Sequence, residues 1–186
     1  MIEFRFHSRG GQGGVVAGKL LAVSFFKEGK HVQTFPTFGV ERRGAPVMTY
    51  VRISDKPIRL RNQVYEPDHL VILDPSLIAY FDVTQGLKKG GIILVNTDKD
   101  VAEFEFSTDF QPIAVNAARI ALDHKLGSIT QPIVNTAIIG AIAKVTGLVS
   151  LDSVVAAIKE EAPVKPEENA AAAVDAYNAM DRLALA

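Results

Sequence analysis

The stretch that decides the fold is IEFRFHSRGGQGGVVAGKLLAVSFFK, residues 2–27. Apolar and polar side chains alternate from Ile2 to His7, which is the period of a β-strand. Five of the fourteen glycines then fall between Gly10 and Gly18. The run from Val15 to Lys27 has helical spacing and ends before Gly29, and glycine is typical of a helix C-terminus. A strand, a glycine-rich turn and a helix in this order predict the opening unit of an α/β fold.

Segments further along the chain extend this pattern. Strands are predicted at 31–35, 47–53, 69–74, 92–95 and 112–115, an edge strand at 103–107, and helices at 75–81, 116–126, 135–146, 151–161 and 166–184. Continuous apolar strands separated by helices predict a sheet that is covered on both faces. We therefore expect one domain, residues 1–186: a Rossmann-like, three-layer α/β/α sandwich with a mostly parallel or mixed sheet and a helical C-terminal part.

Composition narrows the class of protein. The chain has 186 residues, 48% hydrophobic, with a net charge of −1 and no cysteine, which excludes disulfides, thiol nucleophiles and cysteine ligation of an iron–sulfur cluster. No apolar run is long enough for a membrane span, and the N-terminus does not resemble a signal peptide, so we expect a cytoplasmic protein. A pI near 6.4 argues against nucleic-acid binding, and four scattered histidines argue against a metal site.

Charge is unevenly distributed along the chain. Residues 41–61 carry six basic and two acidic side chains, whereas residues 150–186 carry three basic and seven acidic ones. Two solvated surfaces are the simpler interpretation. The basic stretch is also suited to contact with a phosphate or an acidic partner.

The glycine-rich turn is the clearest candidate for a ligand site. Glycine permits a positive φ and close approach to the backbone, and the helix that follows offers free amides to an anion. The candidate cofactor-binding residues are Gly10, Gly11, Gln12, Gly13 and Gly14. The alternative is a tight turn that binds nothing.

Two nucleotide-binding templates fail at this turn. In the dinucleotide fingerprint the third glycine position falls on Val16, and no acidic residue ends the next strand at 33–35. In the P-loop template Leu20 stands where a magnesium-binding serine or threonine belongs. Asp74 and Asn96 end predicted strands at the same sheet edge, where helix or turn capping is the favoured role and ligand binding the alternative.

Three motifs together resemble a known family. They are Arg9-Gly10-Gly11-Gln12-Gly13-Gly14, then FPTFGVERRGAPV at 35–47, and PDHLVILD at 67–74. NTAIIGA at 135–141 adds to the likeness. The chain resembles, over nearly its whole length, the gamma subunit of 2-oxoacid:ferredoxin oxidoreductases, most closely that of the pyruvate enzymes.

The resemblance implies a subunit that is inactive alone. The family complex uses thiamine diphosphate, Mg²⁺, iron–sulfur clusters and coenzyme A to convert a 2-oxoacid, here pyruvate, into acyl-CoA and CO₂ while reducing ferredoxin. We expect partner subunits of the thiamine-binding and ferredoxin-like kinds, ferredoxin reached through the complex, and no catalytic residue or cofactor held by this chain alone. The second candidate segment, facing an interface or a cofactor, comprises Gly39, Glu41, Arg42, Arg43 and Gly44. The alternative function is a freestanding enzyme that binds a phosphate ligand at Gly10–Gly14.

Overall fold

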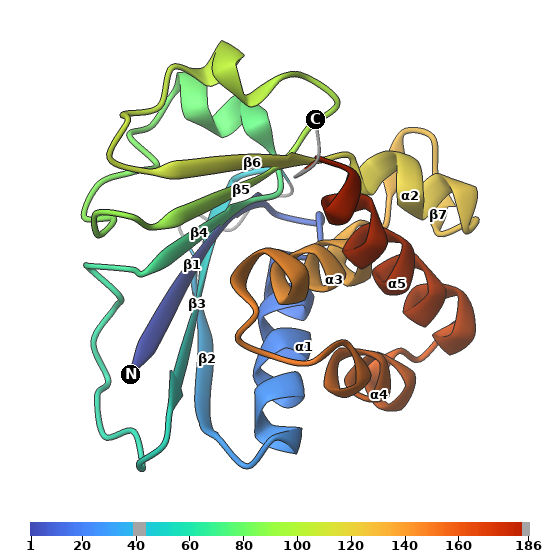
Figure 1. Ribbon diagram of the computed structural model, residues 1–186, viewed down its shortest axis with the longest axis horizontal. Coiled ribbons are helices and arrows are strands. Elements are labelled where there is room, and N and C mark those ends of the chain that lie inside the picture. Colours follow the sequence, from blue (N-terminus) through green and yellow to red (C-terminus); the bar gives the residue numbers. More distant parts are fainter. Residues whose placement is uncertain (39–43, 184–186) are drawn as a thin grey trace.

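The computed structural model describes residues 1–38 and 44–183, which form a sheet with helices packed on it (Figure 1). The main sheet contains β1 (Ile2–Arg9), β2 (His31–Phe38), β3 (Pro46–Ser54), β4 (His69–Ile72), β5 (Ile92–Asn96) and β6 (Gln111–Val115). The α-helices are α1 (Gly14–Lys27), α2 (Ala117–Asp123), α3 (Asn135–Thr146), α4 (Leu151–Glu161) and α5 (Pro166–Leu183). The remaining elements are two 3-10 helices, η1 (Pro75–Ala79) and η2 (Val101–Phe104), and a small hairpin of β7 (Gly127–Ser128) and β8 (Gln131–Pro132).

The sheet is mixed, and its order is β2-β3-β1-β4-β5-β6. Strands β1, β4, β5 and β6 pair in parallel, whereas β3 runs antiparallel to both β1 and β2. The predicted α/β class, with a mixed sheet and a helical C-terminal part, is confirmed. Because β1 lies between β3 and β4, the glycine-rich turn at its end sits centrally on the carboxyl edge of the sheet.

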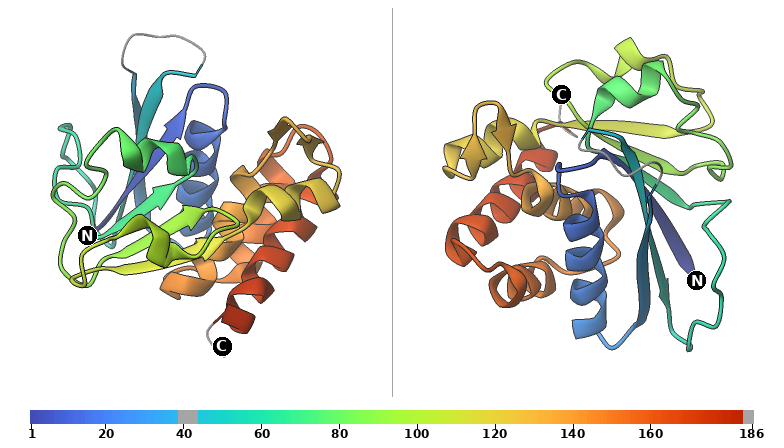
Figure 2. Two further views of the ribbon diagram at one scale, coloured as in Figure 1. Left: turned by 90° about the horizontal axis from the view of Figure 1, so that it is seen from above. Right: turned by 180° about the vertical axis from the view of Figure 1, so that it is seen from behind.

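Four α-helices cover one face of the sheet. Figures 1 and 2 show α1 against the strands, with α3, α4 and α5 gathered beside it. The larger apolar cluster lies here and includes Phe4 and Phe6 of β1 and Phe25 of α1. Close packing is possible because a Cβ on Gly18 would lie only 2.6 Å from Thr49 Cγ2 of β3. Any larger residue at Gly18 would push α1 away from the sheet.

The other face is covered by 3-10 helices and irregular chain. The helix predicted at 75–81 is the short η1. The edge strand predicted at 103–107 is wrong: η2 occupies its start, and Glu105 has a left-handed φ of 50° that an extended strand does not contain. The alternation of Phe104 and Phe106 instead reflects two rings that pack on a second apolar cluster. The third layer therefore contains no α-helix among the described residues.

The polar side of β1 is buried beneath this layer. Arg5 Nη2 donates to the carbonyl oxygen of Val83 at 2.9 Å, and Arg5 Nε donates to His7 Nε2 at 3.1 Å. Arg52 of β3 is only 1% exposed and bonds Glu3 Oε1 through Nε at 2.7 Å. These two arginines fill the space between sheet and loops with paired polar groups.

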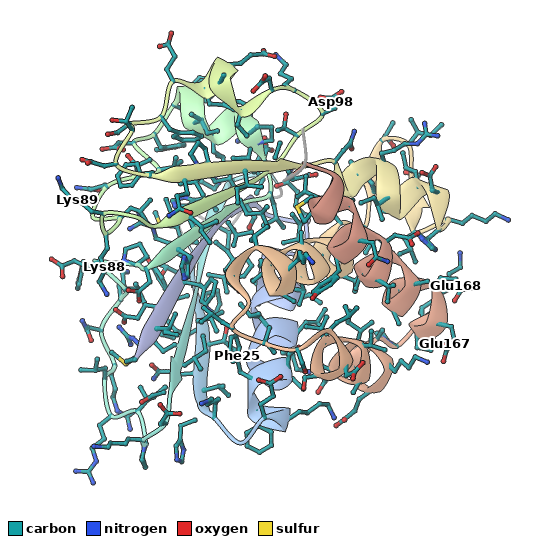
Figure 3. All side chains as sticks on the ribbon, in the orientation of Figure 1. Phe25, Lys88, Lys89, Asp98, Glu167 and Glu168 are labelled. Carbon is teal, nitrogen blue, oxygen red and sulfur yellow. The ribbon has the colours of Figure 1, made fainter. Side chains whose placement is uncertain are left out.

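The charged stretches of the sequence differ in their exposure. In the basic stretch 41–61, the burial of Arg52 contradicts a wholly solvated surface. In the acidic stretch 150–186, Glu167 and Glu168 project outward from the start of α5 (Figure 3). The solvated interpretation thus holds for this part of the acidic stretch and fails for Arg52.

His7 makes stability depend on pH. Burial, followed by the charge of Arg5, lowers the pKa of His7 from 6.5 to about 3. Between these two pH values His7 is protonated in the unfolded chain but not in the folded chain. The free energy of unfolding therefore falls as the pH drops from 6.5 towards 3. We expect the melting temperature of His7→Gln, whose amide oxygen still accepts from Arg5, to fall less steeply over this range than that of the wild type. Parallel curves would contradict the assignment, and His31→Gln at an exposed histidine is the control.

Candidate functional site

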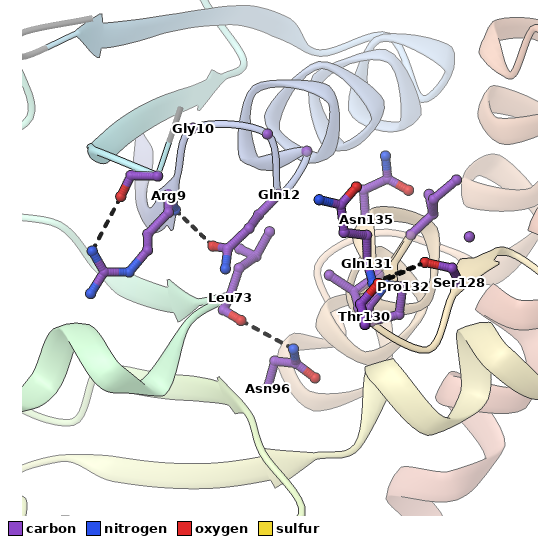
Figure 4. Close-up of a pocket in the computed structure, with 16 residues that line it drawn as sticks. Arg9, Gly10, Gln12, Leu73, Asn96, Ser128, Thr130, Gln131, Pro132 and Asn135 are labelled. Carbon is purple, nitrogen blue, oxygen red and sulfur yellow. Dashed lines mark hydrogen bonds between the residues drawn. The ribbon is translucent and has the colours of Figure 1, made fainter. Parts of the chain in front are cut away.

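A pocket of about 790 Å³ opens at the carboxyl edge of the sheet, where β1, β4 and β5 end (Figure 4). The glycine-rich turn forms one wall, and residues 127–135 form the other, with Leu73 and Asn96 between them. Of the five predicted turn residues, Gly10–Gly13 line the pocket, while Gly14 is buried at the start of α1. Open α/β sheets bind ligands at this edge, next to the ends of parallel strands.

Gly13 has the backbone conformation expected of it. Its φ is +80°, in the left-handed region, and a Cβ there would lie 3.1 Å from Asn135 Nδ2. Gly14 is constrained differently, because a Cβ there would overlap the side chain of Ser8. The turn from β1 into α1 therefore has little room for side chains at Gly13 and Gly14, while its Gly10 and Gln12 amides already donate within the protein, to Ala45 O and Arg9 O.

Two helix N-termini meet at this pocket. α1 begins after Gly13 and α3 begins after Val134, and neither cap residue supplies a side-chain hydrogen bond. The first amides of a helix have no intrahelical acceptor, and the helix dipole makes them partly positive. Both sets of donors border one space, so an anion placed there would be stabilised from two sides.

Asn135 adds a side-chain donor to the same space. The residue is only 9% exposed, and its Oδ1 accepts from the amide of Thr136 at 2.8 Å. No hydrogen bond within residues 1–38 and 44–183 engages its Nδ2, which Figure 4 shows directed towards the glycine-rich turn. Because Nδ2 is not among the fully buried side-chain atoms without a partner, it is reachable from the pocket and can donate to a ligand or to water. Asn135 was not predicted as a site residue, because it begins a helix whose residues are mostly apolar.

The hairpin of β7 and β8 closes the pocket opposite the turn. Ser128, Thr130 and Gln131 line it, and the Ser128 and Thr130 hydroxyls lie 3.3 Å apart. Ile129 at the hairpin tip is 87% exposed. Strands of two residues are too short to show an alternation of apolar and polar side chains. Only Gly127 and Pro132 could have indicated a turn here.

The second predicted segment meets the first at its C-terminal end. Gly44 lines the pocket, its amide donates to Gly10 O at 3.1 Å, and the amide of Gly10 donates to Ala45 O at 2.8 Å. Gly39, Glu41, Arg42 and Arg43 lie outside the described residues. The two motifs, distant in sequence, are thus joined by a pair of backbone hydrogen bonds.

Asp74 and Asn96 have the capping roles that the sequence favoured. Asp74 Oδ1 accepts from the amide of Ser76 at the start of η1, and Asn96 Oδ1 accepts from the amide of Ala118 in α2. Asn96 also lines the pocket. Partial burial opposes ionisation of Asp74, but hydrogen bonds from Ser76 and Gln12 and the charge of Arg9 outweigh it and lower its pKa.

No group of three or more histidine, cysteine, aspartate or glutamate side chains is placed to hold a metal ion in the part of the chain that the structure describes. In that same part, no helix combines the length and apolarity that crossing a bilayer requires.

The chain matches a family model and several proteins along almost its full length. Residues 3–179 match the model described as pyruvate ferredoxin/flavodoxin oxidoreductase. The common subunit gamma of the pyruvate/ketoisovalerate oxidoreductases of Thermococcus kodakarensis is 55% identical, over 96% of each chain. Pyruvate synthase subunit PorC of Methanothermobacter marburgensis is 51% identical, over 97% of this chain and 98% of that protein.

Solved structures agree with this assignment. The pyruvate oxidoreductase subunit PORC of Thermotoga maritima superposes with a TM-score of 0.79 at 34% identity, over 95% of both chains. The 2-oxoglutarate:ferredoxin oxidoreductase of Magnetococcus marinus shares the fold, with a TM-score of 0.74 at 20% identity, and matches through 31% of its longer chain. This chain therefore belongs to the pyruvate ferredoxin/flavodoxin oxidoreductase family, as a gamma-type subunit of a multi-subunit oxidoreductase.

Proposed function

We propose that this gamma subunit holds the phosphates of coenzyme A for a complex that converts pyruvate, coenzyme A and oxidised ferredoxin into acetyl-CoA, CO₂ and reduced ferredoxin. The observation that carries the proposal is the meeting of two helix N-termini at one pocket, with Asn135 Nδ2 beside them. The pyruvate/ketoisovalerate and pyruvate synthase relatives support the choice of substrate.

The chemistry of coenzyme A suits this pocket. The molecule carries a diphosphate and a 3′-phosphate, and backbone amides at helix N-termini are common phosphate ligands. Arg9 lines the described pocket, but its charge is paired with that of Asp74. The attraction of the pocket for an anion therefore rests mainly on the dipoles of α1 and α3 and on their backbone amides. The Magnetococcus marinus enzyme of the same fold was solved with coenzyme A and succinyl-CoA bound, which supports this ligand class.

The redox chemistry belongs to other subunits in this proposal. A chain without cysteine supplies no thiolate to an iron–sulfur cluster, and no G-D-G…N pattern for thiamine diphosphate and Mg²⁺ occurs in the sequence. We place these cofactors on thiamine-binding and ferredoxin-like partners in the cytoplasm, with ferredoxin as the acceptor. The freestanding enzyme that the glycine-rich turn also allowed is disfavoured, because the relatives are named as subunits.

A charge at Asn135 tests the phosphate site. Asn135→Asp keeps the oxygen that accepts from Thr136, and a carboxylate is favourable at a helix N-terminus, so the fold should be retained. The carboxylate would repel a phosphate and remove the Nδ2 donor, and we expect the KM for coenzyme A of the reconstituted complex to rise by about tenfold or more. The KM for pyruvate should stay unchanged.

Asn116→Asp is the matched control for this variant. Asn116 caps α2 through Oδ1, which accepts from the amide of Arg119 at 2.9 Å, and it lies outside the pocket. The same change of charge should leave the KM for coenzyme A within twofold of the wild type. Equal KM values for the wild type and Asn135→Asp would overturn the proposed phosphate site.

We further propose that Arg42 and Arg43 contact a partner subunit or a phosphate of coenzyme A. Their segment ends at Gly44, on the rim of the pocket. Two adjacent arginines are stabilised where acidic or phosphate groups pair with them, and truncating a desolvated pair typically costs about 2 kcal/mol or more.

The double variant Arg42→Ala/Arg43→Ala should fold normally and bind its partners or coenzyme A about thirtyfold more weakly. Subunit association and the KM for coenzyme A are the two measurements. Arg59→Ala/Arg61→Ala, at two exposed arginines of the same basic stretch, removes equal charge as a control. If both double variants behave like the wild type, Arg42 and Arg43 are solvated surface residues.

A further inference from the structure

We propose that Asp74 and Arg9 are positioning residues that fix the shape of the glycine-rich turn, attach it to Gly44, and so set the affinity of the pocket for its anion. The inference rests on the proposed phosphate site and goes beyond it, because neither residue is assigned to hold the ligand. It follows from one hydrogen-bond network that joins segments from three parts of the sequence.

Asp74 is the acceptor at the centre of this network. Its Oδ2 accepts from Arg9 Nε at 3.0 Å and from Gln12 Nε2 at 2.8 Å. Its Oδ1 accepts from the amide and the hydroxyl of Ser76, at 3.0 and 2.6 Å. The side chain is only 16% exposed, and all four bonds are made to an ionised carboxylate, so the position of Asp74 is tightly determined.

Arg9 carries the connection from Asp74 to the second motif. Besides its bond to Asp74, its Nη2 donates to Ser76 Oγ at 2.9 Å and its Nη1 donates to Gly44 O at 3.2 Å. Figure 4 shows this side chain beside the glycine-rich turn, directed away from Asn135. One guanidinium thus fixes the end of β1 against both η1 and the Gly44 end of the second segment.

Gln12 links the same network to the turn itself. Its Oε1 accepts from the amide of Arg9 at 2.7 Å, while its Nε2 donates to Asp74. Both ends of the side chain are therefore used inside the protein. The middle residue of the Gly11-Gln12-Gly13 motif braces the turn, and the ligand is left to the backbone amides.

The shape of the turn decides how well those amides bind an anion. Gly11 and Gly13 both have a positive φ, of 94° and 80°, in a segment whose glycines have wide conformational freedom. Binding to backbone donors depends on their direction, so an unbraced turn would present them in many arrangements and lose affinity on ordering. The network removes this freedom before the ligand arrives.

Two substitutions separate positioning from folding. Asp74→Asn keeps the Oδ1 acceptor for Ser76 but replaces Oδ2 by an amide NH2 group. Arg9 and Gln12, which both donate to Oδ2, then face a donor in place of their acceptor. Arg9→Lys keeps the positive charge beside Asp74, but one ammonium cannot serve Asp74, Ser76 and Gly44 in the geometry of the guanidinium fork. Each variant is studied in the reconstituted complex, with coenzyme A and pyruvate varied separately.

Asp68→Asn is the matched control. Asp68 also pairs a carboxylate with a cation, Lys88 at 2.7 Å, and accepts from the amide of Glu3 at 2.8 Å, but it precedes β4 at the opposite edge of the sheet. This control is expected to keep the wild-type KM for coenzyme A. It reports what a general loss of one carboxylate charge does to the complex.

We expect Asp74→Asn and Arg9→Lys each to raise the KM for coenzyme A by about tenfold or more, with a much smaller change in kcat and none in the KM for pyruvate. The inference is overturned if both variants keep the wild-type KM for coenzyme A while Asn135→Asp raises it. It is also overturned if all kinetic constants, including those of Asp68→Asn, change together. If Asn135→Asp has no effect either, the phosphate site itself is refuted.

Discussion

At the end of β1 the chain turns into α1 at Gly13 and Gly14, two positions where any side chain would be strained or would overlap a neighbouring residue. Gly13 needs a positive φ and lies against Asn135, while Gly14 lies against Ser8. Because a side chain would be strained at Gly13 and would overlap Ser8 at Gly14, no side chain of these two residues covers the start of α1. On the two sides of this turn, α1 packs closely on β3 at Gly18, and α3 begins next to Gly13.

The sequence predicted the strands and helices whose apolar side chains recur at regular spacing. Residues 2–27 gave a correct strand, turn and helix, since alternation and helical spacing are properties of neighbouring residues. Segment 103–107 failed because its two phenylalanines alternate for a tertiary reason: Phe104, the last residue of η2, and Phe106 both pack on the second apolar cluster. The burial of Arg52 depends on Glu3 and on the covering loops, which local sequence does not reveal.

The lining of the candidate pocket was predicted in part for the same reason. Glycine at the turn is a local signal, and Gly10–Gly13 do line the pocket. Asn135 is 122 residues beyond Gly13 in the chain, and its contribution arises only when α3 packs beside α1. The local signal for Asn135 is a polar residue at the first position of a mostly apolar helix, where the helix dipole favours an anion.

The described pocket contains few free charges, which fits a subunit that handles a ligand shared with other chains. Arg9 is neutralised by Asp74, and the remaining donors are amides whose positions the backbone fixes. Fixed dipoles bind phosphate without the strong, long-range attraction of unpaired lysine or arginine. Under the proposed function, such a site would hold coenzyme A and still allow its release as an acyl thioester.

The most direct test is a cryo-EM map of the assembled complex with coenzyme A bound. We expect a phosphate group within hydrogen-bond distance of the Gly13 and Gly14 amides and of Asn135 Nδ2, between the turn and the start of α3. A map in which the whole of coenzyme A lies on other subunits, with no ligand density in this pocket, would contradict the account.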